Sequence, residues 1–171
     1  LHGSSAASDV YKRQVVGISG CSKLTSSLLS EIKSKKIDFV IANGENAAAQ
    51  GVGLTEEICK DFYNCGVNVI TTGNHVWDQK EIMRYIEKEE RLLRPKNLFE
   101  PAPGRGFQIF KTDKNIKIGV LNLMGNVFMK KCEDVFDTSK KFLSEYKLKD
   151  DYDLLVVDFP VSYTHLRAHE T

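Results

Sequence analysis

The sequence predicts an α/β fold in which helices alternate with the strands of a mostly parallel sheet. The first observation is that short, continuous apolar runs occur at residues 37–42, 67–72 and 153–159, with helical periodicity between them. The second is a turn signal between two strand-like runs at residues 107–111 and 116–123, which indicates an added antiparallel hairpin. Alternation of this kind is typical of βα units, whose helices cover a parallel sheet.

The composition narrows the class of protein. The chain has 171 residues, of which 42% are hydrophobic, and this is enough for one domain with its own core. A formal net charge of +1 excludes a broad surface for nucleic acid or an anionic membrane. No apolar run approaches the roughly 18 residues of a membrane-spanning helix. Four cysteines without a CxxC pair are typical of buried side chains in a reducing compartment, so we expect a cytoplasmic protein without a membrane partner.

Four helices are expected between the strands. The first spans about residues 22–36, where leucine and isoleucine recur at helical spacing and share one face. The second begins after Thr55, a capping residue followed by two glutamates, and ends before Gly66. Asp78 has the position of an N-cap for the third, and the last covers about residues 138–146.

The apolar runs are expected to be interior strands covered on both faces. The run at 37–42 is closed by an Asn-Gly pair at 43–44, which indicates a turn directly after the strand. The run at 67–72 ends at a glycine in the same way. The segment 91–106 is rich in proline and glycine, and such a long loop can be the lip of a site or a rigid cover.

Polar side chains follow two of the predicted strands at the point where each strand ends. The segment 43–46 contains Glu45 between asparagines, and the segment 73–75 ends in His75. Ligands of open α/β sheets bind beyond the carboxyl ends of the strands, so both segments are expected at one edge. A carboxylate with neighbouring amide oxygens suits a divalent or trivalent metal. From the residues alone, His75 can be a ligand, a proton donor or a structural residue, and both segments can be ordinary turns.

The two ends of the chain do not continue these patterns. Residues 1–14 and 161–171 have no apolar periodicity, and both resemble translated sequencing-adapter read-through. We therefore expect an artefact tail at 1–14, a partial domain at 15–160 and a second artefact tail at 161–171. The alternative is a genuine flexible tail at each end.

Several motifs carry a resemblance to a known family. The segment Asn-Gly-Glu-Asn-Ala-Ala at 43–48, with Gly-Val-Gly-Leu-Thr at 51–55, resembles the second metal motif of YmdB-type metallophosphoesterases. The segment 72–78 resembles their Gly-Asn-His-x-Trp-Asp motif, part of which the wider calcineurin-like superfamily shares. Three further segments match in order and spacing, at 94–97, 103–106 and 121–125. The likeness covers essentially all of 15–160, which is identified as a partial metallophosphoesterase domain.

The resemblance implies an incomplete calcineurin-like α/β/β/α sandwich with a mixed, largely parallel sheet. It also implies two metal ions, iron and/or manganese, in the intact protein, and hydrolysis of small phosphodiesters such as cyclic nucleotides. By position, Glu45 would bridge the two metals, and Asn46 and Asn74 would each complete a metal's shell. His75 would face the leaving-group oxygen and protonate it, while the metals activate a shared water.

The chain departs from the family pattern at both ends of the partial domain. Gln14 stands where the resemblance places an aspartate, and Pro160 stands where it places a histidine ligand after Asp-Phe. A later Gly-His-x-His motif is missing from this sequence. Metal affinity depends on the number, charge and geometry of the ligands, so we expect this chain to bind a metal pair poorly and to be nearly inactive.

Two other classes of function compete with hydrolysis. One is a nucleotide-binding α/β module without hydrolysis, although the segment 17–20 matches neither Gly-x-Gly-x-x-Gly nor a Walker phosphate loop. The other is an interaction or scaffold protein on the same fold. The expected partner is a small phosphodiester rather than nucleic acid or membrane, and the sequence leaves open whether the protein is a homo-oligomer.

Overall fold

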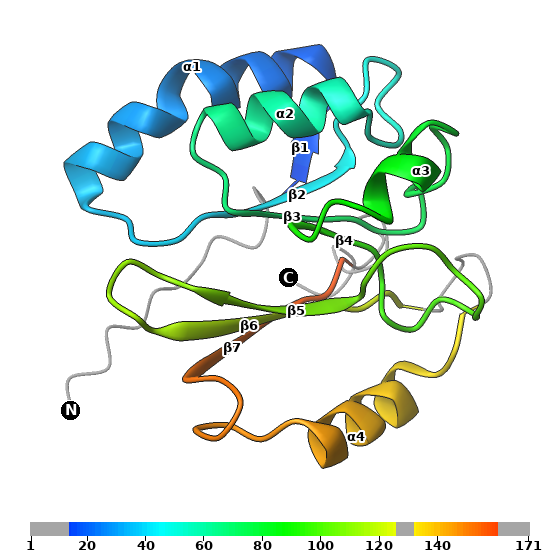
Figure 1. Cartoon of the computed structure of the whole chain (residues 1–171). Coiled ribbons are helices and arrows are strands. Elements are labelled where there is room, and N and C mark those ends of the chain that lie inside the picture. Colours follow the sequence, from blue (N-terminus) through cyan, green and yellow to red (C-terminus); the bar gives the residue numbers. More distant parts are fainter. Residues whose placement is uncertain (1–13, 126–131, 161–171) are drawn as a thin grey trace, which may run out of the picture.

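Two sheets lie face to face between two layers of helices (Figure 1). The computed structural model describes residues 14–125 and 132–160. Helices α1 (Gly17–Lys35) and α2 (Glu56–Asn64) cover the first sheet, and α4 (Val135–Glu145) covers the second. This α/β/β/α arrangement confirms the fold class that the sequence predicts. Residues 1–13 of the tail predicted at 1–14, and the whole tail predicted at 161–171, lie outside the described residues.

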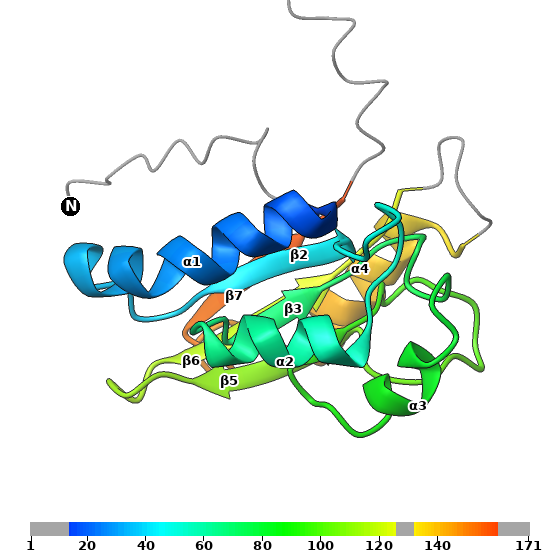
Figure 2. The same cartoon turned by 90° about the horizontal axis from the view of Figure 1, so that it is seen from above.

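The first sheet is parallel throughout. Its strands, in spatial order, are β1 (Gln14–Val16), β2 (Ile41–Asn46), β3 (Val69–Thr71) and β4 (Leu92–Leu93). Seen from above, α1 and α2 lie over these strands (Figure 2). The sequence predicts β3 but neither β1 nor β4. Strand β1 begins at Gln14, which the sequence pattern assigns to a tail, and the two-residue β4 is too short to leave a periodic signal.

Strand β2 corrects a prediction, because the expected turn at 43–44 is part of the strand. Asn43 pairs with both neighbouring strands, and Asn46 pairs with Val16 of β1. Gly44 packs tightly inside the sheet: a Cβ atom there would lie 3.1 Å from the side chain of Ile70 and 3.2 Å from that of Leu54. Pairing on both sides therefore overrides the local turn preference of the Asn-Gly pair.

The second sheet contains the predicted hairpin and one parallel strand. It consists of β5 (Phe107–Lys111), β6 (Lys117–Asn122) and β7 (Leu154–Asp158), with β5 antiparallel and β7 parallel to β6. The hairpin turn has Asn115 at a φ of 60°, a left-handed conformation that asparagine tolerates.

Strand β7 is not an interior strand of the described sheet, so that part of the expectation is wrong, although Val156 and Leu155 pack on its two faces. In the described part of the chain it pairs with β6 alone and forms an edge of the sheet. Leu154 and Val157 are 51% and 43% exposed. The apolar run gives a strand in the expected place, but its composition does not show how many neighbours the strand has.

Helix α2 has the ends that the sequence predicts. The Thr55 hydroxyl accepts a hydrogen bond from the Ile58 N–H at 3.3 Å, which caps the first turn. Gly66 follows the helix with a φ of 101°, a conformation that glycine adopts without strain.

The other helices differ from the prediction at their starts. Helix α1 begins at Gly17 rather than near residue 22, and α4 begins at Val135 after its cap Asp134. Helix α3 (Ile82–Ile86) is preceded by Glu81, so Asp78 is not its N-cap. The Asp78 side chain is engaged with His75 in a turn before the helix. None of the helices in the described residues has the length and apolarity needed to cross a bilayer.

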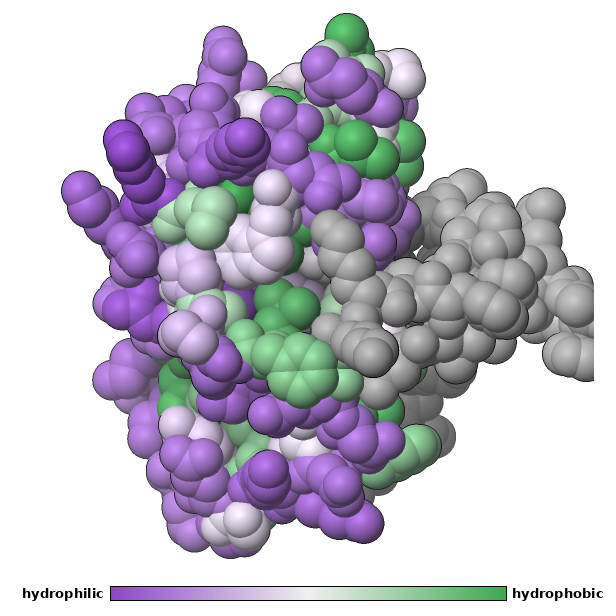
Figure 3. Space-filling model, turned by 90° about the vertical axis from the view of Figure 1, so that its right-hand side faces the viewer, coloured by the Kyte–Doolittle hydropathy of each residue, from purple (hydrophilic) through white to green (hydrophobic). Residues whose placement is uncertain are grey.

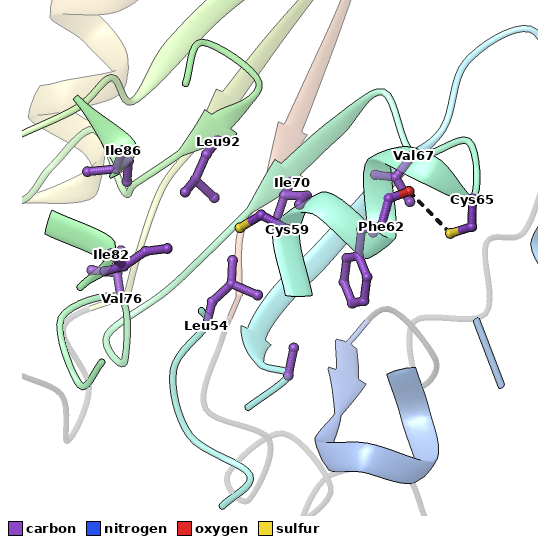
Figure 4. Packing of buried hydrophobic residues seen from close by; sticks show 12 residues of the cluster. Leu54, Cys59, Phe62, Cys65, Val67, Ile70, Val76, Ile82, Ile86 and Leu92 are labelled. Atoms are coloured by element: carbon purple, nitrogen blue, oxygen red, sulfur yellow. Dashed lines mark hydrogen bonds between the residues drawn. The ribbon is translucent and has the colours of Figure 1, made fainter. Parts of the chain in front are cut away.

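Three apolar clusters hold the four layers together. The largest lies between the first sheet and its helices and includes Leu54, Phe62, Ile70 and Leu92 (Figure 4). A second cluster fills the gap between the two sheets, and a third packs the second sheet against α4 around Phe142. Because successive side chains of a strand point to opposite faces, each sheet contributes to two of these clusters.

The proline-rich loop between β4 and β5 is pinned from inside. The Arg94 guanidinium is buried and donates hydrogen bonds to three main-chain carbonyls of the loop and to Glu100. The face that carries this loop and α3 is mostly hydrophilic, with hydrophobic side chains gathered near its centre (Figure 3). Met83 and Phe99 are 44% and 56% exposed. The inner contacts of Arg94 favour a rigid cover over a mobile lip.

Candidate active site

The two polar segments that the sequence singles out meet at the carboxyl end of the first sheet. Glu45, next to the last residue of β2, is 3% exposed, and its carboxylate accepts the main-chain N–H groups of Asn74 and His75. Gly73 packs against the same group, because a Cβ atom on it would lie 2.3 Å from the Glu45 Cδ. The turn that follows β3 therefore wraps around the carboxylate.

The surroundings of Glu45 shift the pKa of its carboxyl group in opposite directions. Burial raises the pKa of the Glu45 carboxyl above its ordinary value, because a desolvated carboxylate is disfavoured. Nearby His75 and the N–H groups of Asn74 and His75 lower this pKa, and Asp158 adds to the rise. A buried carboxylate of this kind is stabilised by any cation that reaches it.

The Gln14 side chain lies between two of the predicted metal ligands. Its Nε2 donates to Glu45 Oε2 at 3.1 Å, and its Oε1 accepts from Asn46 Nδ2 at 3.1 Å. The sequence assigns Gln14 to a tail, whereas the structure makes it the first residue of β1, paired with Asn43. The neutral side-chain amide of Gln14 therefore bridges Glu45 and Asn46.

His75 is oriented by a carboxylate three residues further along the chain. Its Nδ1 lies 2.6 Å from Asp78 Oδ2, and the two side chains are 33% and 28% exposed. The contact of Nδ1 with Asp78 fixes the orientation of the ring, with Nε2 on its other side. The sequence pattern predicts a helix cap at Asp78 and misses this pair. The His-x-x-Asp spacing, short enough for one turn, is the signal that could have predicted it.

The opposite sheet also contributes to the site, which the sequence did not suggest. Asp158, the last residue of β7, accepts hydrogen bonds from Asn43 Nδ2 at 2.9 Å and Thr71 Oγ1 at 2.5 Å. Asn122, the last residue of β6, donates to the Thr72 carbonyl just before Gly73. No local pattern reveals these contacts, because the partners are far apart along the chain.

The described residues do not by themselves fit a two-metal centre. Within residues 14–125 and 132–160, no three His, Cys, Asp or Glu side chains lie together as a metal would require. Glu45 is the one carboxylate among the predicted ligands, and Asn46 and Asn74 add neutral amides. Hard cations favour several charged oxygens, so this donor set is too weak for a pair of them.

Comparison with known proteins identifies the family. A family model described as "YmdB-like protein" matches residues 11–167. The chain belongs to the YmdB-like family. The 2',3'-cyclic-nucleotide 2'-phosphodiesterase of Bacillus subtilis is 36% identical over 151 residues, covering 88% of this chain and 55% of the relative. A putative phosphatase/phosphodiesterase of Mycoplasma pneumoniae is 34% identical over 162 residues, covering 91% and 55%.

Solved structures share the fold. A hypothetical protein from Thermus thermophilus superposes with a TM-score of 0.78 at 31% identity, covering 87% of this chain and 56% of that one. A structure described as a novel phosphatase, from Mycoplasma pneumoniae, gives 0.77 at 30% identity and covers 87% and 53%. The chain thus spans about half the length of these relatives and solved structures.

Proposed function

We propose that the protein is a metal-dependent phosphodiesterase that hydrolyses small phosphodiesters such as cyclic nucleotides. The observation that carries this proposal is the enclosure of the Glu45 carboxylate by the turn at 73–75. That contact brings an acid, two asparagines and a histidine from separate strands to one edge of the sheet. The Bacillus subtilis relative, named as a cyclic-nucleotide phosphodiesterase, supports the substrate class.

Each site residue has a role in this proposal. Glu45, Asn46 and Asn74 would supply ligands for iron or manganese in the full-length protein. His75 donates a proton to the leaving oxygen from Nε2, and Asp78 holds the ring through Nδ1. A partly exposed imidazole suits this role, because the substrate must reach it from solvent.

The chain as it stands is proposed to be a weak metal binder with little turnover. Gln14 donates a hydrogen bond to Glu45, and a cation would have to displace that bond. The remaining ligands are neutral, so the gain on metal binding is small. We therefore assign the proposed activity to a full-length protein, meaning one that spans the whole length of the relatives.

The test compares the full-length protein with this chain. Hydrolysis of a chromogenic phosphodiester with added manganese measures turnover, and elemental analysis measures the bound metal. For the full-length protein we expect two metal ions per chain, and a loss of about 10²–10⁴-fold in turnover in its His75→Ala variant. The exposed Ser30→Ala variant on α1 serves as the control. Turnover that survives Glu45→Gln, or tight cyclic-nucleotide binding in chelator without hydrolysis, would overturn the proposal. Appreciable turnover by this chain, lost in His75→Ala, would contradict its expected inactivity.

A further inference from the structure

The side chains between the two sheets change from apolar to polar along the strands. In the middle of the gap between the sheets, the facing side chains are apolar, and the buried ones are Val69, Leu93, Ile118 and Val120. Two residues further along the strands, the same faces carry polar side chains instead: Asn43, Thr71, Asn122 and Asp158. This polar layer lies directly behind the carboxyl ends that carry Glu45 and the turn at 73–75.

Asp158 joins the second sheet to the strand that carries Glu45. Its Oδ2 accepts from Asn43 on β2 and from Thr71 on β3, two residues that are paired with each other across the first sheet. Asn43 Oδ1 in turn accepts the Glu45 main-chain N–H at 3.1 Å. One carboxylate therefore fixes the side chain that holds the Glu45 backbone.

Asn122 does the same for the turn after β3. It is paired with Asp158 across β6 and β7 and is fully buried. Its Nδ2 donates to the Thr72 carbonyl at 2.8 Å and to the Leu93 carbonyl at 3.1 Å. The Thr72 carbonyl belongs to the peptide group that leads into Gly73, so Asn122 sets where the turn begins.

The burial of Asn122 has an energetic consequence. Among the described residues its Oδ1 has no hydrogen-bond partner, and a buried acceptor without a partner costs free energy. Its Nδ2, however, satisfies two carbonyls from two strands at once. A leucine here would leave both carbonyls without this donor, so the amide fixes the geometry of β3 and β4 and also contributes to stability.

We propose that Asn122 and Asp158 are positioning residues, which hold Glu45 and the turn at 73–75 in register from the opposite sheet. Asp158 acts through Asn43 and Thr71, and Asn122 acts through the Thr72 carbonyl. Neither residue needs to touch substrate. The importance of this register for catalysis rests on the proposed function, whereas the register itself can be measured without any activity.

The experiment measures amide hydrogen exchange at Asn74 and His75, whose N–H groups bond to Glu45, together with global stability by urea unfolding. In Asn122→Leu and Asp158→Asn we expect exchange at these two amides to accelerate by about tenfold or more beyond the loss of global stability. The single tryptophan, Trp77, lies two residues after His75, so its emission should shift in the same variants.

Asn97→Leu is the matched control. Asn97 is equally buried, but its side chain bonds to Met124 and Glu133 instead of the turn. We expect this variant to lose global stability while exchange at Asn74 and His75 follows that loss alone.

A milder pair of variants covers the case in which a buried substitution prevents folding. Thr71→Val removes the hydroxyl that donates to Asp158, and Thr71→Ser keeps it. Exchange should accelerate in the valine variant and recover in the serine variant. Local exchange that only follows global stability in all of these variants would overturn the positioning role. A failure of the full-length protein to hydrolyse phosphodiesters would overturn the proposed function but would not affect the positioning role measured by hydrogen exchange.

Discussion

The Glu45 carboxyl group occupies the space that a side chain on residue 73 would need. A Cβ atom on Gly73 would lie 2.3 Å from the Glu45 Cδ and 2.4 Å from each carboxylate oxygen. Glycine at this position is therefore required for close approach, and the turn after β3 and the end of β2 interlock through these two residues.

Replacing Gly73 by alanine should separate the turn from Glu45. Because the added methyl group overlaps the carboxylate, we expect a loss of about 1–3 kcal/mol in the free energy of unfolding, measured by urea denaturation. Gly125→Ala is the control, since its Cβ would lie 3.6 Å from Phe159, an ordinary contact. Equal stability of the two variants would contradict the close approach.

Glu89 should stabilise the fold only above acidic pH. Burial by itself raises the pKa of Glu89, but the side-chain and main-chain N–H groups of Arg91 and the Tyr85 hydroxyl hold it below its ordinary value of 4.5. The folded state then binds fewer protons than the unfolded state, so this contribution is complete above pH 4.5 and is lost as the pH falls through the folded-state pKa.

The variant Glu89→Gln tests this linkage. At pH 7 we expect it to be about 1 kcal/mol less stable than the parent chain, since hydrogen bonds to a charged partner are lost. The difference should shrink as urea unfolding is repeated at lower pH. The same substitution at the exposed Glu87 should matter little, and a difference for Glu89→Gln that does not depend on pH would argue against the linkage.

The edge of β7 should cause self-association at high concentration. Half-exposed apolar side chains on a strand that, in the described residues, pairs on one side only are typical of a surface that recruits another strand. Leu154→Lys should therefore reduce association in sedimentation velocity. Leu143→Lys is the matched control on α4, because Leu143 is 54% exposed and Leu154 is 51% exposed. An equal effect of both substitutions would assign the association to general hydrophobicity.

Arg94→Lys should loosen the loop between β4 and β5. A lysine ammonium lacks the planar fork that lets Arg94 reach the Pro95, Ala102 and Pro103 carbonyls and Glu100 together. We expect a loss of about 2–3 kcal/mol in stability, because buried carbonyls are left without donors. Arg84→Lys, at an exposed position of α3, should be neutral. A neutral Arg94→Lys variant would show that the loop does not depend on this network.

Local signals predicted the parts of the fold that depend on neighbouring residues. Thr55 and Gly66 mark the ends of α2 because a cap and a left-handed glycine act within one turn of the helix. The Asn-Gly pair in β2 misled for the opposite reason. Its conformation is set by β1 and β3, and sequence alone does not report pairing with distant strands.

The same distinction applies to the candidate site. The sequence brought Glu45 and His75 to one edge of the sheet, because parallel strands place their carboxyl ends together. It did not predict the contacts from the second sheet, because Asp158 of β7 lies 115 positions away from its partner Asn43 of β2. Nor did it find the link from Gln14 to Glu45, because that contact depends on the short β1 pairing with β2.

Helix α1 is the outermost layer of the first sheet, and it has no fully buried residue among its 19. Several of its serine hydroxyls bond back to carbonyls of the same helix, which weakens its intrinsic helical preference. Such an element detaches at a smaller free energy than the sandwiched strands do. Local unfolding of α1 would expose β1 and, with it, the Gln14 amide that bonds to Glu45, while the contacts that Asp158 and Asn122 make from the second sheet would remain in place.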